Sequence, residues 1–120
     1  MRILPLAVLI TLTAIVPAQA AGFLDGAYGN REGCKYAKTG ESSGADEFFL
    51  LNDEGITTAV SVCSFKGKAS KTADGFTINA QCDAEGEIGP EGSVHLTRTQ
   101  KGYTVKFEDG TEWGPLPKCR

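Results

Sequence analysis

The sequence predicts an all-β fold: a small antiparallel barrel or sandwich of about seven to eight short strands, an up-and-down meander cross-linked by disulfides. Turn-forming residues recur about every ten residues, and between them lie short runs rich in β-branched and aromatic residues. No window of about eleven residues keeps the apolar period of a helix. Four cysteines follow an export signal. Regularly spaced short strands are typical of sandwiches and barrels.

The first 20 residues have the pattern of a secretory signal peptide. Arg2 supplies a positive charge, residues 3–16 are almost entirely apolar, and small residues precede a cleavage site. We expect cleavage between Ala20 and Ala21, which leaves one soluble domain, residues 21–120, without a membrane anchor. That domain carries 11 Lys or Arg side chains against 15 Asp or Glu, a formal net charge of −4.

Strands are predicted where apolar and polar residues alternate or where apolar residues run together. The first two expected strands, residues 47–51 and 56–65, flank an Asn-Asp-Glu-Gly turn. In the first of them, an apolar run favours a buried strand over a helical turn. The alternation indicates the later strands. The expected strands cover residues 47–51, 56–65, 76–80, 94–97 and 103–107.

The expected core consists of the apolar residues that these strands direct inward. The C-terminal segment 113–119 contains two prolines, which lack a backbone N–H, so it is not expected to form a long central strand. It needs an anchor, which Cys119 provides. The predicted core is Tyr28, Phe48, Leu50, Ile56, Val60, Val62, Phe76, Ile78, Val94, Leu96, Tyr103, Val105, Phe107 and Trp113.

Four cysteines in an exported domain of this size predict two disulfides. Three connectivities are open. The simplest joins Cys34 near the start to Cys119 near the end, and joins Cys63 to Cys82 across neighbouring strands. A zinc site is disfavoured, because there is no Cys-x-x-Cys pair and His95 has no partner at ligand spacing.

Residues that carry catalytic chemistry are scarce. His95 is the one histidine and lies between Val94 and Leu96, which directs it outward on its strand. No glycine-rich loop leads from a strand into a helix, and the paired carboxylates fall in turns. We therefore expect neither an enzyme nor a cofactor or metal site. The acidic balance argues against nucleic acid or an anionic membrane as the partner.

A basic segment stands out within this acidic chain. Lys66, Lys68 and Lys71 fall within six residues, after an apolar strand and before an Asp-Gly turn. The segment is therefore predicted to be a protruding, flexible connection. Such connections often carry binding residues, whereas lysines near strand ends also prevent edge-to-edge pairing, so both roles are open.

Two short stretches resemble those of the membrane-bound and periplasmic c-type lysozyme inhibitors of Gram-negative bacteria. Ser43-Gly44-Ala45 is similar to a Ser-Gly-Ala step of that family, and Phe65-Lys66-Gly67-Lys68-Ala69 to a Lys-Gly step after an aromatic residue. The resemblance implies a compact periplasmic β-barrel that blocks host or phage muramidases. It also implies that Ser43 and Lys66, with Lys68 beside them, are offered to the enzyme's cleft.

The expected function is therefore inhibition of lysozyme or another peptidoglycan hydrolase, by a loop inserted into a cleft that holds two carboxylates. A cationic muramidase is the expected partner, because an acidic protein would associate with it faster. The alternative is a non-enzymatic envelope protein that binds another partner or has a structural role. The inhibitor is expected to be a monomer or a weak dimer.

Overall fold

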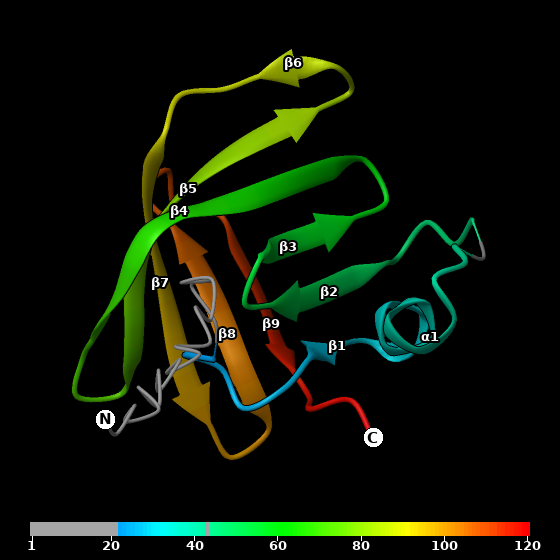
Figure 1. The fold of residues 1–120 in the computed structure, drawn as a ribbon, viewed down its shortest axis with the longest axis horizontal. Coiled ribbons are helices and arrows are strands. Elements are labelled where there is room, and N and C mark those ends of the chain that lie inside the picture. Colours follow the sequence, from blue (N-terminus) through cyan, green and yellow to red (C-terminus); the bar gives the residue numbers. More distant parts are fainter. Residues whose placement is uncertain (1–21, 43) are drawn as a thin grey trace, which may run out of the picture.

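The computed structural model describes residues 22–42 and 44–120, which form nine antiparallel strands and one helix (Figure 1). The predicted signal peptide lies outside the described residues. The strands are β1 (Tyr28–Gly29), β2 (Phe49–Asn52), β3 (Gly55–Thr58), β4 (Ser61–Lys71), β5 (Gly75–Ala84), β6 (Glu87–Ile88), β7 (Gly92–Thr99), β8 (Gly102–Phe107) and β9 (Glu112–Leu116). The helix is α1 (Arg31–Thr39).

The strands lie in the sheet in chain order, so the predicted meander is confirmed. The path runs β1-β2-β3-β4-β5-β7-β8-β9, and β6 pairs with β5 beyond the end of β7. The two ends of the path then meet: the Gly29 N–H donates to the Pro117 carbonyl at 2.9 Å, and the Cys119 N–H donates to the Ala27 carbonyl at 2.8 Å. The result is a nearly closed barrel of eight strands. Closure leaves few unpaired strand edges.

The barrel interior holds most of the predicted core. The predicted residues that are buried are Tyr28, Phe48, Leu50, Ile56, Ile78, Val94, Leu96, Tyr103 and Val105. Phe48 and Leu50 are buried outside the central cluster, because Leu50 shares a cross-strand row with the outward Thr57 and Val62. Phe76, Phe107 and Trp113 are half-buried and pack against the central cluster. The buried hydrophobic residues that were not predicted are Leu24, Leu51, Cys63, Ala80 and Leu116.

Val60 and Val62 were wrongly assigned to the core, because residues 56–65 do not form one strand. The Thr58 hydroxyl accepts hydrogen bonds from the N–H groups of Val60 and Ser61, and this turn separates β3 from β4. Val60 lies at the turn and is 62% exposed. Val62 pairs with Thr57 on the outer face of the barrel and is 52% exposed, whereas its neighbour Cys63 pairs with Ile56 on the inner face.

The helix α1 was missed, because nine residues are too few to show a sustained helical period. Its ends do carry sequence signals. The Asn30 side chain caps the first turn by accepting from the Gly33 N–H at 2.9 Å, and Gly40 ends the helix in the left-handed conformation. Asn30 also accepts from the Phe49 N–H, so the same side chain attaches the helix to β2. The ring of Tyr36 packs against Phe48, with centroids 5.2 Å apart.

Both disulfides have the predicted connectivity. Cys34–Cys119 joins α1 to the C-terminal tail, and Cys63–Cys82 joins directly paired positions of β4 and β5. The two cysteines of the first disulfide are 85 residues apart in the sequence, and those of the second are 19 apart. The anchor that the proline-containing tail requires is therefore present. The tail forms the short strand β9 and then the contacts that close the barrel.

We predict that Gly33→Ala destabilises the protein by roughly 1–3 kcal/mol, the usual cost of overpacking. A Cβ atom at this position would lie 1.8 Å from the Phe49 carbonyl oxygen, so α1 would have to move away from β2. Gly92→Ala is the matched control, because its Cβ would meet only the end of the Glu108 side chain, at 3.5 Å. Urea unfolding followed by circular dichroism measures both. Equal effects of the two changes would refute the close approach.

We predict that loss of Cys34–Cys119 destabilises the protein more than loss of Cys63–Cys82. In the loop-entropy description, the stabilisation expected from the longer loop exceeds that from the shorter one by about 1.3 kcal/mol at room temperature. The double variants Cys34→Ala/Cys119→Ala and Cys63→Ala/Cys82→Ala would be compared by urea unfolding. A larger loss in the second variant would show that packing of the buried Cys63 outweighs loop entropy.

Candidate functional site: the outer face of β4, β5 and β6

Lys66 lies on the strand β4 and not in a flexible connection, so that prediction was wrong; the turn of the hairpin follows at 72–74. The strand is interrupted at this point by a bulge. Lys66 pairs with Asn79 and Ser70 with Thr77, so β4 has two more residues than β5 across the interval. Gly67 adopts a φ of 74°, which a glycine readily allows. Bulges of this kind redirect side chains, and Lys66 and Lys68 are both exposed here.

Lys66 belongs to a group of outward side chains that we call the β4–β6 face. Val62, Asp83 and Ile88 occupy one cross-strand row, and Ser64 and Gln81 occupy the next. Together they enclose a shallow hollow of about 250 Å³. The six residues that line it and define the face are Val62, Ser64, Lys66, Gln81, Asp83 and Ile88.

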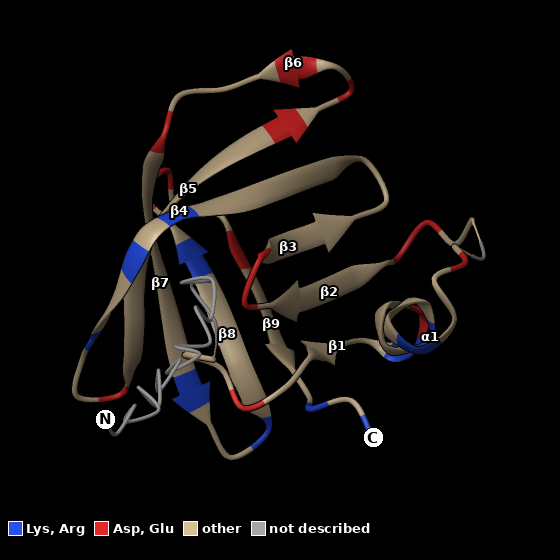
Figure 2. Cartoon of the chain, in the orientation of Figure 1, with Lys and Arg blue, Asp and Glu red and all other residues tan. Residues whose placement is uncertain are grey.

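The β4–β6 face combines apolar and charged groups. Ile88 is 69% exposed. Among the described residues, the large apolar side chains that are exposed are Val60, Val62 and Ile88. Carboxylates surround them: Asp83 lies on the face, and Glu85 and Glu87 are exposed in the adjoining hairpin. Figure 2 shows this acidic colouring on β5, β6 and the turn between them. One cation, Lys66, therefore lies beside an apolar patch with an acidic border.

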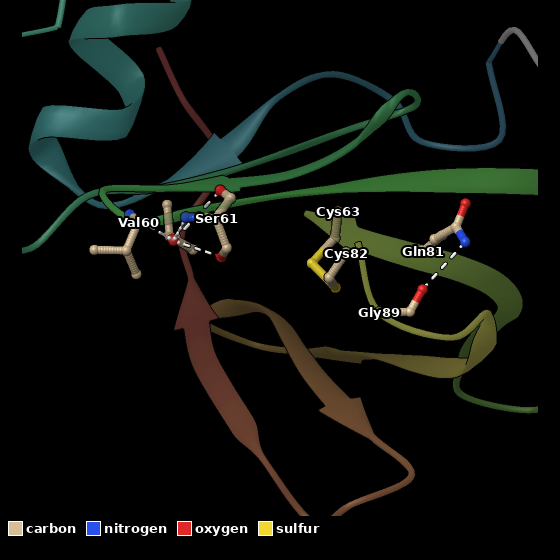
Figure 3. The surroundings of a disulfide bond; sticks show 7 residues. Val60, Ser61, Cys63, Gln81, Cys82 and Gly89 are labelled. Atoms are coloured by element: carbon tan, nitrogen blue, oxygen red, sulfur yellow. Dashed lines mark hydrogen bonds between the residues drawn. A yellow bond between two sulfur atoms is a disulfide. The ribbon is translucent and has the colours of Figure 1, made fainter. Parts of the chain in front are cut away.

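Hydrogen bonds and a disulfide hold the β4–β6 face in place (Figure 3). Cys63–Cys82 joins β4 to β5 directly behind it. The Gln81 amide donates to the Gly89 carbonyl at 3.1 Å, and the Gly89 N–H donates to the Cys82 carbonyl at 2.9 Å. The tight turn between β5 and β6 is closed by the Gly86 N–H, which donates to Asp83. The face is thus fixed before any partner arrives.

The other residues singled out in the sequence do not join this face. Ser43 lies outside the described residues, so its position relative to Lys66 stays a prediction. Lys68 is exposed but does not line the hollow. His95 is exposed, as predicted, and its Nδ1 lies 3.0 Å from the Thr77 hydroxyl. The apolar part of the face was missed, because Val60 and Val62 were expected to be inside.

Residues 22–42 and 44–120 contain no group of three or more His, Cys, Asp or Glu side chains that could hold a metal ion. In the same part of the chain, no helix has the length and apolar character needed to cross a membrane.

The largest pKa shift belongs to a buried tyrosine at the barrel closure. Burial raises the pKa of Tyr28 to about 12, and the hydrogen bond that its hydroxyl donates to Asp25 acts in the same direction. That bond and the nearby Lys118 ammonium lower the pKa of Asp25. The Thr111 N–H lowers the pKa of Asp109 in a turn. Asp25 thus accepts from both Tyr28 and Lys118, which links the segment before β1 to the C-terminal tail.

Comparisons with protein-family models, with curated proteins and with solved structures find no significant match to this chain.

We predict that stability falls between about pH 10 and 12 in a way that depends on Tyr28. The unfolded phenol ionises near its ordinary pKa of 10, whereas the folded one stays neutral until about 12, so this contribution is complete below pH 10 and is lost as the pH rises. Urea unfolding at several alkaline pH values should show a shallower decline for Tyr28→Phe. Tyr36→Phe, on α1, is the control. A decline as steep in Tyr28→Phe as in the unmodified protein would refute the assignment.

Proposed function

We propose that this protein is a non-enzymatic, exported inhibitor of lysozyme or another peptidoglycan hydrolase, and that it docks through the β4–β6 face. The observation that carries the proposal is Lys66, which rises from a bulge beside the exposed side chains of Val62 and Ile88. The Cys63–Cys82 disulfide also supports the proposal, because it cross-links the strands β4 and β5 that carry the face. The disulfides and the absence of a spanning helix among the described residues are compatible with export.

The charges of the face suit a cationic enzyme with an acidic cleft. Asp83, Glu85 and Glu87 would attract a basic protein and raise the association rate. Lys66 would then reach the catalytic carboxylates, of which hydrolases of this type carry a pair. Val62 and Ile88 would be removed from water at the centre of the contact, where binding energy concentrates. The bulge takes the place of the inserted loop that the sequence suggested.

A second candidate is a protein that binds a cationic envelope partner without inhibiting it. The observation in its favour is that Lys66 lies on the face of a strand and that the hollow around it is small, about 250 Å³. A partner could dock flat on such a face with its own cleft left open. The two candidates therefore use the same surface and differ in whether the cleft is blocked.

We predict that Lys66→Glu weakens inhibition at least about 30-fold, because loss of one partner of a buried charge pair costs roughly 2 kcal/mol or more. Clearing of purified peptidoglycan would be followed by turbidity with c-type, g-type and endogenous bacterial lytic enzymes. Lys106→Glu, an equal charge change on β8, is the control. Lys68→Glu is expected to have a smaller effect, because Lys68 does not line the hollow.

Undiminished clearing by every enzyme at a large excess of the protein would refute the inhibitor. If an enzyme still binds in a pull-down while it clears normally, the second candidate is correct. Inhibition that Lys66→Glu leaves intact would refute the site but not the function.

A further inference from the structure

Most cations of this acidic chain gather at the end of the barrel away from the β5–β6 hairpin (Figure 2). Of the 11 Lys and Arg side chains after residue 20, seven line two adjoining hollows. We call these seven residues the basic end. They are Arg31, Lys35, Lys38, Arg98, Lys101, Lys118 and Arg120.

The first hollow lies between the β7–β8 turn and the C-terminal tail and measures about 620 Å³. Arg98 and Lys101 line one side, and Lys118 and Arg120 the other. No carboxylate side chain is among its described lining residues. Asp25 pairs with Lys118 at 3.2 Å, and among the described residues the other three cations form no ion pair. A volume of this size is within the range of small-ligand sites.

The second hollow, of about 360 Å³, lies between α1 and the tail. Arg31, Lys35 and Lys38 recur at the spacing that places side chains on one face of a helix. Arg120 lines both hollows. The Cys34–Cys119 disulfide holds them together, because Cys34 lines the second hollow and Cys119 the first.

We propose that the basic end binds a ligand that carries two or more phosphate groups, spaced across the two hollows. Clustered like charges repel one another unless an anion lies between them. Arginine forks suit phosphate oxygens, and lysines add charge. This surface is separate from the β4–β6 face, so the proposal does not depend on the proposed function.

A phosphate ligand fits the basic end better than a nucleic acid. Single-stranded nucleic acids are usually held by aromatic side chains on which bases stack. The aromatic residue that lines the hollows, Tyr28, is 3% exposed, and its hydroxyl is bonded to Asp25. The large exposed apolar side chains of the described chain lie elsewhere, on or beside the β4–β6 face, so a membrane contact here would involve lipid headgroups and not insertion. The acidic net charge, which argued against nucleic acid or an anionic membrane as the partner, does not describe the local charge at this end of the molecule.

The test is binding of sodium tripolyphosphate, measured by isothermal titration calorimetry. We expect saturable binding that Lys101→Gln/Arg120→Gln weakens at least about tenfold, because it removes charge-assisted hydrogen bonds. Lys68→Gln/Lys106→Gln makes the same change in net charge at exposed positions outside the hollows and should leave binding unchanged. Circular dichroism would confirm that both variants fold.

A second arm distinguishes the sources of phosphate. Cosedimentation with phosphatidylglycerol–phosphatidylcholine vesicles, and not with phosphatidylcholine alone, would identify a lipid headgroup, whereas tripolyphosphate binding without cosedimentation would identify a soluble ligand. Each supports the proposal if Lys101→Gln/Arg120→Gln weakens it and the control pair does not. No binding of either probe, or equal weakening by both double variants, would overturn it. Tighter binding of a single-stranded oligonucleotide than of tripolyphosphate would overturn it in favour of nucleic acid.

Discussion

The barrel closes through the C-terminal tail, and the basic end of the molecule depends on that closure. Prolines leave the tail with few donors, yet the Cys119 N–H and the Pro117 carbonyl both bond to the segment around β1. The Cys34–Cys119 disulfide then attaches the tail to α1. Closure buries Tyr28 against Tyr103, with ring centroids 4.8 Å apart. The same closure brings α1, the tail and the β7–β8 turn together, so the basic end exists only in the closed barrel.

The second disulfide serves a different part of the barrel. Cys63–Cys82 cross-links β4 and β5 at directly paired positions, and β6 is held to β5 by its own hydrogen bonds. The bulge at Gly67 lies on one side of this cross-link, and the exposed Val62 and Ile88 side chains lie on the other. Irregular pairing and exposed apolar groups both reduce stability, and they occur where a covalent bond fixes the strands. The cross-link therefore keeps the strands ordered on either side of these features.

Much of the barrel follows from local sequence patterns, whereas the sites depend on features that those patterns do not capture. Alternation of apolar and polar residues was sufficient to predict the strands β5, β7 and β8 and the outward position of His95. It failed at Thr58, where side-chain hydrogen bonds form a turn inside an apolar run and direct Val62 outward. It also failed at α1, whose nine residues are too few for a sustained period and whose signals are local ones: the caps Asn30 and Gly40, with Glu32 in the first turn and Lys38 in the last. The basic end joins residues 31–38 to residues 98–120, which lie together only because a disulfide and the barrel closure bring them there. No local pattern contains that information.

The separation of charge is the property that unites the two surfaces. A net charge of −4 suggests a uniformly acidic protein, but the carboxylates of the β5–β6 hairpin and the seven cations of the basic end occupy different ends of the barrel (Figure 2). Such a molecule orients in an external field, because each end is attracted to the opposite charge. A cationic protein would therefore meet the β4–β6 face, while a phosphate-bearing ligand would meet the basic end. Because the two surfaces share no residue, the two proposals are compatible in one chain: a protein held by an immobilised phosphate ligand would present the β4–β6 face outward.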